Sequence, residues 1–435
     1  MRLSKPLSRF RSAFWTGFCL MLSTAAGADP AVEALSKARE AARSLTQPVT
    51  LKVWNTHNRE ESETLREQIN RFTSQYPSIR VELDTVAFAD AQNKFKTAAK
   101  AGTAPDVFRS EVVWTPELAD LGYLTPVDEW LSEADRADFL EAPLATCQYR
   151  EETWGLPQVT DCLALLVNRA ALKKAGVAVP TTMDELSSAA RVLGKPADQR
   201  YGFAYPANES YFILPYLWAF GGDLVEASKR EVLVDGPGAV RGLEFVLDLR
   251  RSGAVSPKFD VANDYNNQLE DFRGGLLPMF LMGPWATAAI LSGDGFKSDP
   301  TNLGIHPVPA GPGAHRNSPI GGHTWTIGAR CARPELAFLL IHHLTTPAEQ
   351  AELTRKNNLL PTRKSAYDLE AVKTNSIALA FREVLNSARP RPVLPETASL
   401  IPALTPAFQD ALRGDKTPAQ ALQSVAAQWR QQLRK

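Results

Sequence analysis

The sequence predicts an α/β protein that is divided into two lobes. The chain has 435 residues, and chains longer than roughly 250–300 residues divide into separate hydrophobic cores. Apolar and polar residues alternate over 49–54 and again over 79–83, and a helical repeat lies between these segments. A strand, a helix and a second strand in this order form a βαβ unit, which implies a parallel sheet.

The spacing of apolar residues predicts the individual elements. A short helix is expected over 29–47, which is rich in alanine and charge. The helix between the first two strands places Leu65, Ile69 and Phe72 on one face and ends before Pro77. Further elements are strands over 104–108 and 163–167, helices over 181–193, 238–251 and 334–344, a mainly helical C-terminal part, and Pro-rich loops over 306–319 and 390–395.

The N-terminus has the pattern of a secretory signal peptide. Basic residues precede an apolar run over 13–22, and small residues end at Ala28. The basic residues are Arg2, Lys5, Arg9 and Arg11. The run is shorter than the roughly 20 residues that span a bilayer, so we predict that residues 1–28 are cleaved near Ala28; the alternative is an uncleaved anchor. Asp29, not a cysteine, follows the cut, so the product is expected to be free in the periplasm.

The charge balance argues against nucleic acid as a partner. The whole chain has 48 basic and 48 acidic residues. Removing the four basic residues of the signal peptide leaves an excess of four acidic residues. A mildly acidic protein is not attracted to nucleic acid or to anionic membranes.

The mature chain keeps three cysteines, Cys147, Cys162 and Cys331. Cys147 and Cys162 could form a disulfide in an oxidising compartment. Any pairing leaves one thiol over, so the bridge and the free thiols are both open at this point.

The usual motifs of catalysis are missing from the sequence, which has no G-x-S-x-G, no P-loop and no H-E-x-x-H. His342 and His343 are adjacent, and neighbours on a helix point about 100° apart, which makes a poor metal site. No metal and no cofactor is therefore expected. A pair of carboxylates that hydrolyses glycosides remains an alternative.

Several short segments, taken in order, resemble the landmarks of periplasmic solute-binding proteins of the maltose-binding type. The resemblance covers about 49–430. The segments are Pro105-Asp106-Val107 through Leu121-Gly122-Tyr123-Leu124 and Pro126, Gly155-Leu156-Pro157 with Asp161 and Asn168, Pro215 with Gly221-Gly222, Met282-Gly283-Pro284-Trp285, Gly321-Gly322, and Leu360-Pro361-Thr362.

This resemblance implies the two-lobed periplasmic binding protein fold, with hinge-linked lobes and a ligand cleft between them. The N-terminal lobe would comprise 49–158 and 307–343, and the C-terminal lobe 159–306 and 344–435. It also implies a monomer without enzymatic activity. Such a protein captures a sugar, here a di- or oligosaccharide, and delivers it to the membrane permease subunits of an ABC importer.

A sugar has apolar C–H faces and a fringe of hydroxyls, so its site needs aromatic rings beside carboxylates, amides and guanidinium groups. Trp285 matches the family's stacking tryptophan in the M-x-G-P-W segment. Tyr211 and Glu209 lie in E-S-Y-F, which resembles the family's E-P-Y-F ligand segment. Tyr211 would stack on the sugar and Glu209 would accept its hydroxyls.

The resemblance also implies ligand-binding residues at the ends of the strands. Asp161 matches a carboxylate between the G-x-P segment and the buried strand. Asn58 and Arg59, with His57 beside them, match a loop that carries an acidic and a basic residue in relatives.

Glu111 and Trp114 follow the strand that begins at P-D-V, and His323 follows the Gly-Gly pair. The resemblance implies that these residues also line the cleft. The Asp-Arg pair of the maltose binder is replaced here by Val113 and Trp114, and a third stacking tryptophan by Ile401. Both departures argue against maltose as the ligand.

Other functions remain as alternatives. An exported glycoside hydrolase would use two of the cleft carboxylates, and a binder of the same fold could take a polyol or a sugar phosphate. A phosphate ligand favours a cleft rich in arginine, and few arginines lie near the predicted site: Arg59, Arg109 and Arg363.

Overall fold

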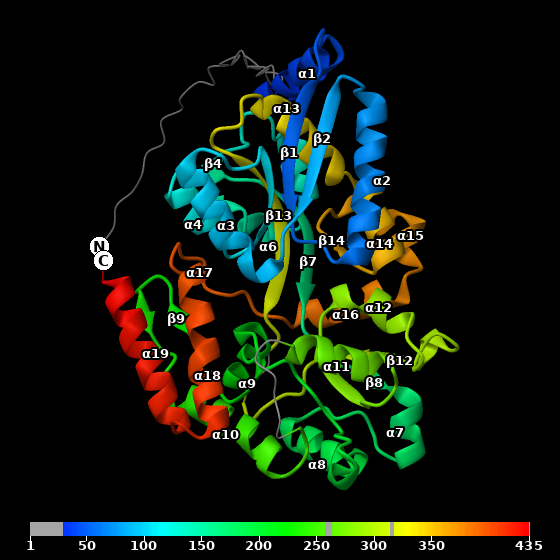
Figure 1. Cartoon of the computed structure of the whole chain (residues 1–435), viewed down its shortest axis with the longest axis vertical. Helices are drawn as coiled ribbons and strands as arrows, with labels where there is room; N and C mark the ends of the chain where they lie inside the picture. The colour runs from blue at the N-terminus through cyan, green and yellow to red at the C-terminus, as the bar shows by residue number, and fades with distance from the viewer. Residues whose placement is uncertain (1–28, 257–262, 314–316, 435) are drawn as a thin grey trace, which may run out of the picture.

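The computed structural model describes residues 29–256, 263–313 and 317–434. These residues form two lobes that follow one another along the long axis of the molecule (Figure 1). The predicted signal peptide lies outside the described residues and stays a prediction. Within the described ranges, no helix has the length and apolar character needed to cross a membrane.

The N-terminal lobe is built on a seven-stranded sheet with the order β14-β7-β13-β3-β1-β2, and β4 pairs with β13. β1 is parallel to β2 and β3, whereas β13 is antiparallel to β3 and β7. The strands are β1 (Val49–Asn55), β2 (Ile79–Thr85), β3 (Val107–Glu111), β4 (Leu124–Thr125), β7 (Leu156–Cys162), β13 (Ile320–Gly328) and β14 (Leu360–Pro361), and a separate hairpin joins β5 (Gln148–Tyr149) to β6 (Glu152–Thr153).

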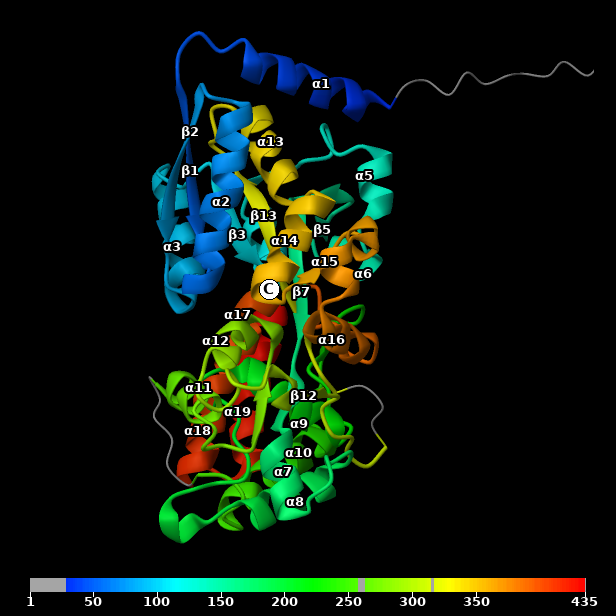
Figure 2. The same cartoon turned by 90° about the vertical axis from the view of Figure 1, so that its right-hand side faces the viewer.

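Helices cover this sheet, and α1 lies across the end of the lobe that is farthest from the other lobe (Figure 2). They are α1 (Pro30–Arg43), α2 (Arg59–Gln75), α3 (Phe88–Ala101), α4 (Thr115–Asp120), α5 (Glu133–Asp138), α6 (Glu141–Ala145), α13 (Pro334–Leu344), α14 (Pro347–Asn357), α15 (Glu370–Lys373) and the 3₁₀ turn η5 (Ser365–Asp368).

The predicted βαβ unit is confirmed by β1, α2 and β2. Leu65 and Phe72 of α2 are fully buried, and Ile69 is nearly so, because the apolar stripe of an amphipathic helix faces the core. The strand expected over 104–108 begins only at Val107. Pro105 has no N–H for a sheet, and the Asp106 side chain, at 2.8 Å, accepts the backbone N–H of Lys52.

The C-terminal lobe has a smaller sheet with the order β11-β8-β12, in which both neighbours are antiparallel to β8. Every residue of β8 is buried, so the buried strand predicted over 163–167 is confirmed with a shift of one residue. The strands are β8 (Ala164–Asn168), β11 (Met279–Met282) and β12 (Leu303–His306), and β9 (Val225–Glu226) pairs with β10 (Glu231–Val232) in a hairpin.

The core of this lobe is separate from that of the N-terminal lobe. Its helices are α7 (Arg169–Ala175), α8 (Met183–Leu193), α9 (Leu214–Ala219), α10 (Pro237–Arg251), α11 (Asp264–Arg273), α12 (Thr287–Leu291), α16 (Ser376–Asn386), α17 (Thr397–Leu400), α18 (Leu404–Arg413) and α19 (Pro418–Leu433). Short 3₁₀ turns are η1 (Pro196–Asp198), η2 (Ser210–Phe212), η3 (Pro284–Ala286), η4 (Pro300–Asn302) and η6 (Ile401–Ala403).

Extended chain segments connect the lobes. β7 runs from the N-terminal sheet toward the second lobe (Figure 2) and continues through Leu163 into β8. Residues 388–395, which we call the hinge segment, follow α16 and contact the start of β13. Arg389 and Ile320 are joined there by a backbone hydrogen bond of 2.8 Å.

The chain stays with the N-terminal lobe longer than the sequence analysis predicts. The expected boundary assigns everything after residue 343 to the C-terminal lobe. Instead, β14 pairs with β7, and Arg71 of α2 forms an ion pair with Glu349 of α14. The landmark Leu360-Pro361 therefore belongs to the edge of the N-terminal sheet, a contact that local apolar spacing does not encode.

The disulfide between Cys147 and Cys162 is not formed, and both residues are buried free thiols. Cys147 Sγ lies 3.3 Å from Thr324 Oγ1 in the N-terminal lobe. Cys162 Sγ contacts the carbonyl oxygen of Phe381 in α16, at 3.8 Å. The two side chains therefore pack against different partners, and closeness in sequence does not bring their sulfur atoms together.

We expect both thiols to be unreactive in the folded protein. Burial raises the pKa of Cys147 to about 12 and that of Cys162 well above its usual value, so little thiolate forms near neutral pH. Alkylation without reductant should label neither residue in the native state and all three cysteines of the mature chain in denaturant. A disulfide-linked pair of peptides in a non-reducing digest would contradict this.

Candidate functional site

Many of the predicted ligand-binding residues gather where the lobes meet. They lie on β3, β7 and β13 and on the turns η2 and η3. The hinge segment reaches the same place. We call this group the interlobe cluster, and it consists of Trp285, Tyr211, Asp161, Glu111, His323 and Arg391.

Trp285 forms an aromatic corner with Tyr211. β11 ends at Met282, and the turn η3 then folds the indole ring back over Gly283, where a Cβ atom would lie 2.0 Å from the ring. The indole N–H donates to the Tyr265 hydroxyl at 2.9 Å. The rings of Trp285 and Tyr211 lie 6.2 Å apart at 51°. The corner thus offers two ring faces at an angle to each other.

Asp161 lies directly beside this corner. The Tyr211 hydroxyl is 3.2 Å from its Oδ1 atom and 3.1 Å from the carbonyl oxygen of Pro319. Burial raises the pKa of Asp161 to about 7, while the charge of Arg391 opposes the shift. Only glycine fits at position 321, because a Cβ there would lie 2.2 Å from Asp161 Oδ1. The glycine therefore allows Asp161 and Tyr211 to approach the backbone of β13 closely. Among the described residues, Tyr211 is the side chain that hydrogen-bonds to this carboxylate.

The sequence predicts that Glu111 accepts hydroxyl groups of a sugar, but in the structure its carboxylate is bound by other parts of the protein. It forms a buried ion pair with Arg391 of the hinge segment and accepts the backbone N–H of Val113 at 3.1 Å. Arg391 also donates to the carbonyl oxygen of Ile320 at 3.2 Å, and its guanidinium group lies 5.1 Å from the centre of the Tyr211 ring. Glu111 therefore fixes Arg391 over the aromatic corner.

Sequence reasoning missed Arg391. Its flanking prolines, Pro390 and Pro392, predict a loop. The sequence feature that could have identified it is a charged residue within a Pro-rich connector between two helical regions. Its partner Glu111 is 280 positions away, and nothing local relates the two.

His57 belongs to a polar network around the buried Arg109. Arg109 donates to Gln158 Oε1 at 2.6 Å, and Gln158 Nε2 lies 3.0 Å from His57 Nε2. Since an amide NH₂ only donates, His57 Nε2 accepts and its Nδ1–H donates to Asn55 Oδ1, at 3.1 Å. Burial and the charge of Arg109 hold the pKa of His57 well below its usual value. Both ring nitrogens are thus used inside the protein.

Three other predicted residues lie apart from the cluster or at its edge. Arg59 is exposed, at 85% for its side chain, and lies 3.7 Å from Glu63, so its place in the cleft stays a prediction. Trp114 is buried in an aromatic stack. Burial raises the pKa of Glu209, and its charge acts on Tyr265 next to Trp285.

Asn58 contributes in two ways. It is the N-cap of α2, where its side-chain oxygen accepts the backbone N–H of Glu61 at 2.9 Å. Its amide also donates to the carbonyl oxygen of Trp285, at 3.2 Å. Asn58 therefore links α2 of the N-terminal lobe to the aromatic corner of the other lobe.

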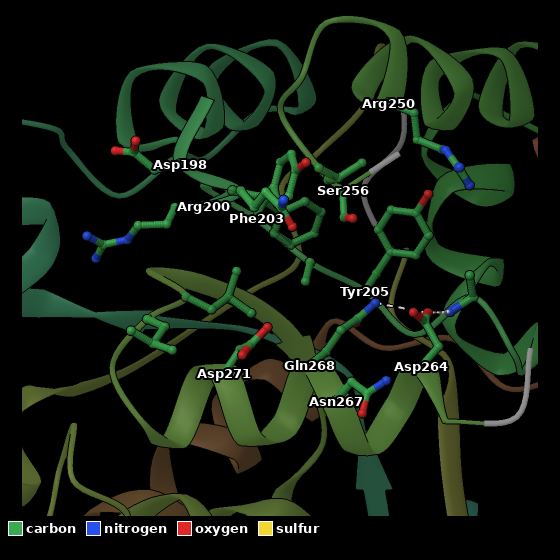
Figure 3. Close-up of a pocket in the computed structure, with 17 residues that line it drawn as sticks. Asp198, Arg200, Phe203, Tyr205, Arg250, Ser256, Asp264, Asn267, Gln268 and Asp271 are labelled. Carbon is green, nitrogen blue, oxygen red and sulfur yellow. Dashed lines mark hydrogen bonds between the residues drawn. The ribbon is translucent and has the colours of Figure 1, made fainter. Parts of the chain in front are cut away.

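A cavity of about 490 Å³ lies elsewhere, within the C-terminal lobe (Figure 3). Figure 3 shows Tyr205 and the carboxylate of Asp264 facing it, and Asp264 accepts from the backbone N–H of Ala207 at 2.7 Å. Its lining contains none of the predicted ligand-binding residues. In the part of the chain that the structure describes, no group of three His, Cys, Asp or Glu side chains could hold a metal ion.

Comparison with known proteins identifies the family. Residues 56–351, more than half of the chain, match the model of the bacterial extracellular solute-binding proteins. The chain belongs to this family. The family consists of binding proteins that serve transport, and the resemblance stated from the sequence landmarks is confirmed.

Relatives within the solute-binding family support the same assignment. A maltotriose-binding protein of Pyrococcus abyssi is 22% identical over 369 residues, which is 84% of this chain and 78% of the relative. The structure of the GacH receptor of Streptomyces glaucescens, determined without ligand and with acarbose, has a TM-score of 0.84 and 33% identity, and covers 89% of this chain and 98% of the receptor.

A solute-binding protein of Thermotoga lettingae, solved with α-D-tagatose, has a TM-score of 0.78 and 26% identity and covers 88% of this chain and 99% of that protein. These neighbours confirm the predicted two-lobed α/β fold of periplasmic binding proteins.

The clash at Gly283 gives a test of how Trp285 is held. Its φ of −102° is open to alanine, so Gly283→Ala should act mainly through the indole ring, which supplies the three atoms nearest to the added Cβ. We expect a loss of about 1–3 kcal/mol in the free energy of unfolding, as for other overpacked sites. In a Trp285→Ala background the same change should cost much less, because the clashing atoms are gone.

Urea unfolding of the four proteins in this cycle measures the difference. Gly274→Ala is a matched control, since its Cβ would lie no closer than 3.1 Å to a neighbour. Equal losses in both backgrounds would show that Trp285 does not fold over Gly283.

Proposed function

We propose that this protein captures a carbohydrate in the periplasm and delivers it, chemically unchanged, to the permease subunits of an ABC importer. The observation that carries the proposal is the aromatic corner of Trp285 and Tyr211 beside the buried carboxylate of Asp161. Membership of the solute-binding family supports it, as do relatives that bind maltotriose, acarbose and tagatose.

The corner has the two kinds of surface that a sugar needs. The ring faces of Trp285 and Tyr211 complement apolar C–H faces, and the carboxylate of Asp161 accepts hydroxyl hydrogens. Arg391 adds donors from the hinge segment. A site of buried polar groups selects its ligand because a group left without a partner costs free energy.

A binding role is favoured over glycoside hydrolysis. A glycosidase needs one protonated and one ionised carboxyl group facing the scissile bond. Glu111 is held in an ion pair by Arg391, so its carboxylate is not free to act as nucleophile or base. Asp161, which is partly protonated near neutral pH, then has no free ionised carboxylate beside it within the interlobe cluster, and the match to the solute-binding family also favours binding.

A phosphorylated ligand is disfavoured by the local charge. Arg109 and Arg391, the buried arginines nearest the aromatic corner, have Glu61 and Glu111 as their respective partners. Arg363 is also buried and pairs with Asp135 and Asp138. Asp161 and Glu209 add negative charge in their ionised forms, which repels a phosphate. A neutral sugar is the better match.

Delivery would depend on closure of the lobes around the ligand. The contact of Asn58 with the Trp285 carbonyl joins the lobes at the cluster, and Asn358 donates to Thr287 Oγ1 at 3.1 Å nearby. A ligand that binds the closed form better shifts the population toward it. We propose that the permease recognises this closed form of a monomer, exported with residues 1–28 as its signal peptide.

Thermal shift with maltotriose, acarbose, tagatose and glycerophosphocholine tests the function. We expect one or more of the sugars to raise the melting temperature, with no product released. Trp285→Ala should still unfold cooperatively but lose the shift, whereas Trp285→Phe should keep part of it. Stabilisation by glycerophosphocholine alone, or hydrolysis of the sugar, would overturn the proposal.

Sugar binding should release protons through Asp161. Its pKa of about 7 leaves it partly protonated near neutral pH, and a hydroxyl that donates to the carboxylate favours the ionised form. Binding therefore lowers the pKa, and affinity should rise as the pH increases from about 5 to about 7 and level off above.

Calorimetry in buffers of different ionisation enthalpy measures this proton release. Asp161→Asn, which keeps the size of the side chain, should abolish the release and flatten the pH profile. Proton uptake by the wild-type protein would contradict the assignment of Asp161.

A further inference from the structure

A stack of aromatic rings runs from the core of the N-terminal lobe to its surface. Phe95 and Phe108 lie 4.3 Å apart at 14°, Phe108 and Trp114 6.2 Å apart at 10°, and Trp114 and Phe88 5.1 Å apart at 29°. The inner three rings are buried, whereas Phe88, the first residue of α3, is 41% exposed. The stack therefore ends in an exposed ring that its inner neighbours hold in place.

This exposed ring adjoins the interlobe cluster through His323. The rings of Phe88 and His323 lie 6.0 Å apart, edge to face. His323 pairs with Glu111 between β13 and β3, and Glu111 holds Arg391. Phe88 thus contacts the interlobe cluster directly, on the opposite lobe from Trp285.

His323 has hydrogen-bonding capacity that the described residues leave unused. Both ring nitrogens are buried, and neither has a hydrogen-bond partner within the described ranges. His57, by contrast, has both nitrogens engaged. A neutral imidazole carries one hydrogen-bond donor and one acceptor. A sugar hydroxyl can also both donate and accept a hydrogen bond, so the two groups are complementary.

We propose that Phe88 and His323 form a second sugar subsite, on the N-terminal lobe, in addition to the aromatic corner on the C-terminal lobe. The Phe88 ring packs on one face of a sugar unit, and His323 binds its hydroxyls. Both nitrogens are covered in this arrangement, so the groups that cover them must move aside when the subsite fills. This inference rests on the proposed function and makes the ligand an oligosaccharide, with one unit at each aromatic platform.

The test compares affinities for glucose, maltose and maltotriose by calorimetry. In the wild-type protein, affinity should rise with chain length as the second subsite is filled. Phe88→Ala should weaken binding of the longest sugar that binds by roughly threefold to tenfold, as expected for one aromatic contact, and should flatten the gain with length. Phe88→Trp should preserve it.

Matched variants separate this loss from a general defect. Leu121→Ala removes another exposed apolar side chain of the same lobe and should leave all affinities unchanged. His323→Phe should flatten the length dependence as Phe88→Ala does, while His323→Gln, which keeps a donor and an acceptor, should retain more of it.

The outcomes also distinguish the two proposals. No change in Phe88→Ala, an equal loss for every sugar, or a wild-type protein that binds only the monosaccharides glucose or tagatose would overturn the subsite and leave the proposed function standing. A wild-type protein that binds none of these sugars or acarbose would overturn both.

Discussion

The junction of the two lobes depends on two arginines that are buried together with carboxylates. Removing a charge from water costs several kcal/mol unless partners replace the lost hydration. Arg109 has Glu61, Gln158 and Thr56 within reach. Arg391 has Glu111 and a backbone carbonyl. These partners lie on α2, in the loop before it, and on β7, β3 and β13, while Arg391 itself lies in the hinge segment. Satisfying two charges therefore fixes the relative position of these parts of the chain.

The same requirement decides which side chains remain available to a ligand. Glu111 and His57 are committed to the arginines and their networks, which makes them supports for the site. Asp161 and His323 are left with capacity to spare, since the first is engaged by one tyrosine hydroxyl and the second has no partner among the described residues. A polar ligand that supplies both donors and acceptors would complete them, and the aromatic rings on either side set the planes between which it fits.

Much of the fold was predictable because it follows from local spacing. The β1-α2-β2 unit, the buried strand β8 and the helices α8, α10 and α13 repeat their apolar residues with the period of their element. The approximate place of Trp285 was predictable because glycine and proline precede it. The features that could not be predicted depend on contacts between residues far apart in the sequence. The partner of Glu111, the position of β14 at the edge of the N-terminal sheet and the separate surroundings of Cys147 and Cys162 depend on segments that meet only in the folded chain.

The arrangement of these contacts also explains how closure and binding can be coupled. Asn58 caps α2 with one side-chain atom and reaches the Trp285 carbonyl with another, so the lobes touch through a residue that the N-terminal lobe already holds rigid. Its amide donates to a backbone oxygen, which water can replace when the lobes separate, so this contact alone contributes little to closure. The preference for the closed form must then come from what lies between the lobes. A ligand shifts that equilibrium only by the difference between its affinities for the open and closed forms. A ligand that contacts Phe88 and His323 on one lobe can also contact Trp285 and Tyr211 on the other lobe only in the closed form. Its affinity for the closed form is therefore higher, and binding favours closure.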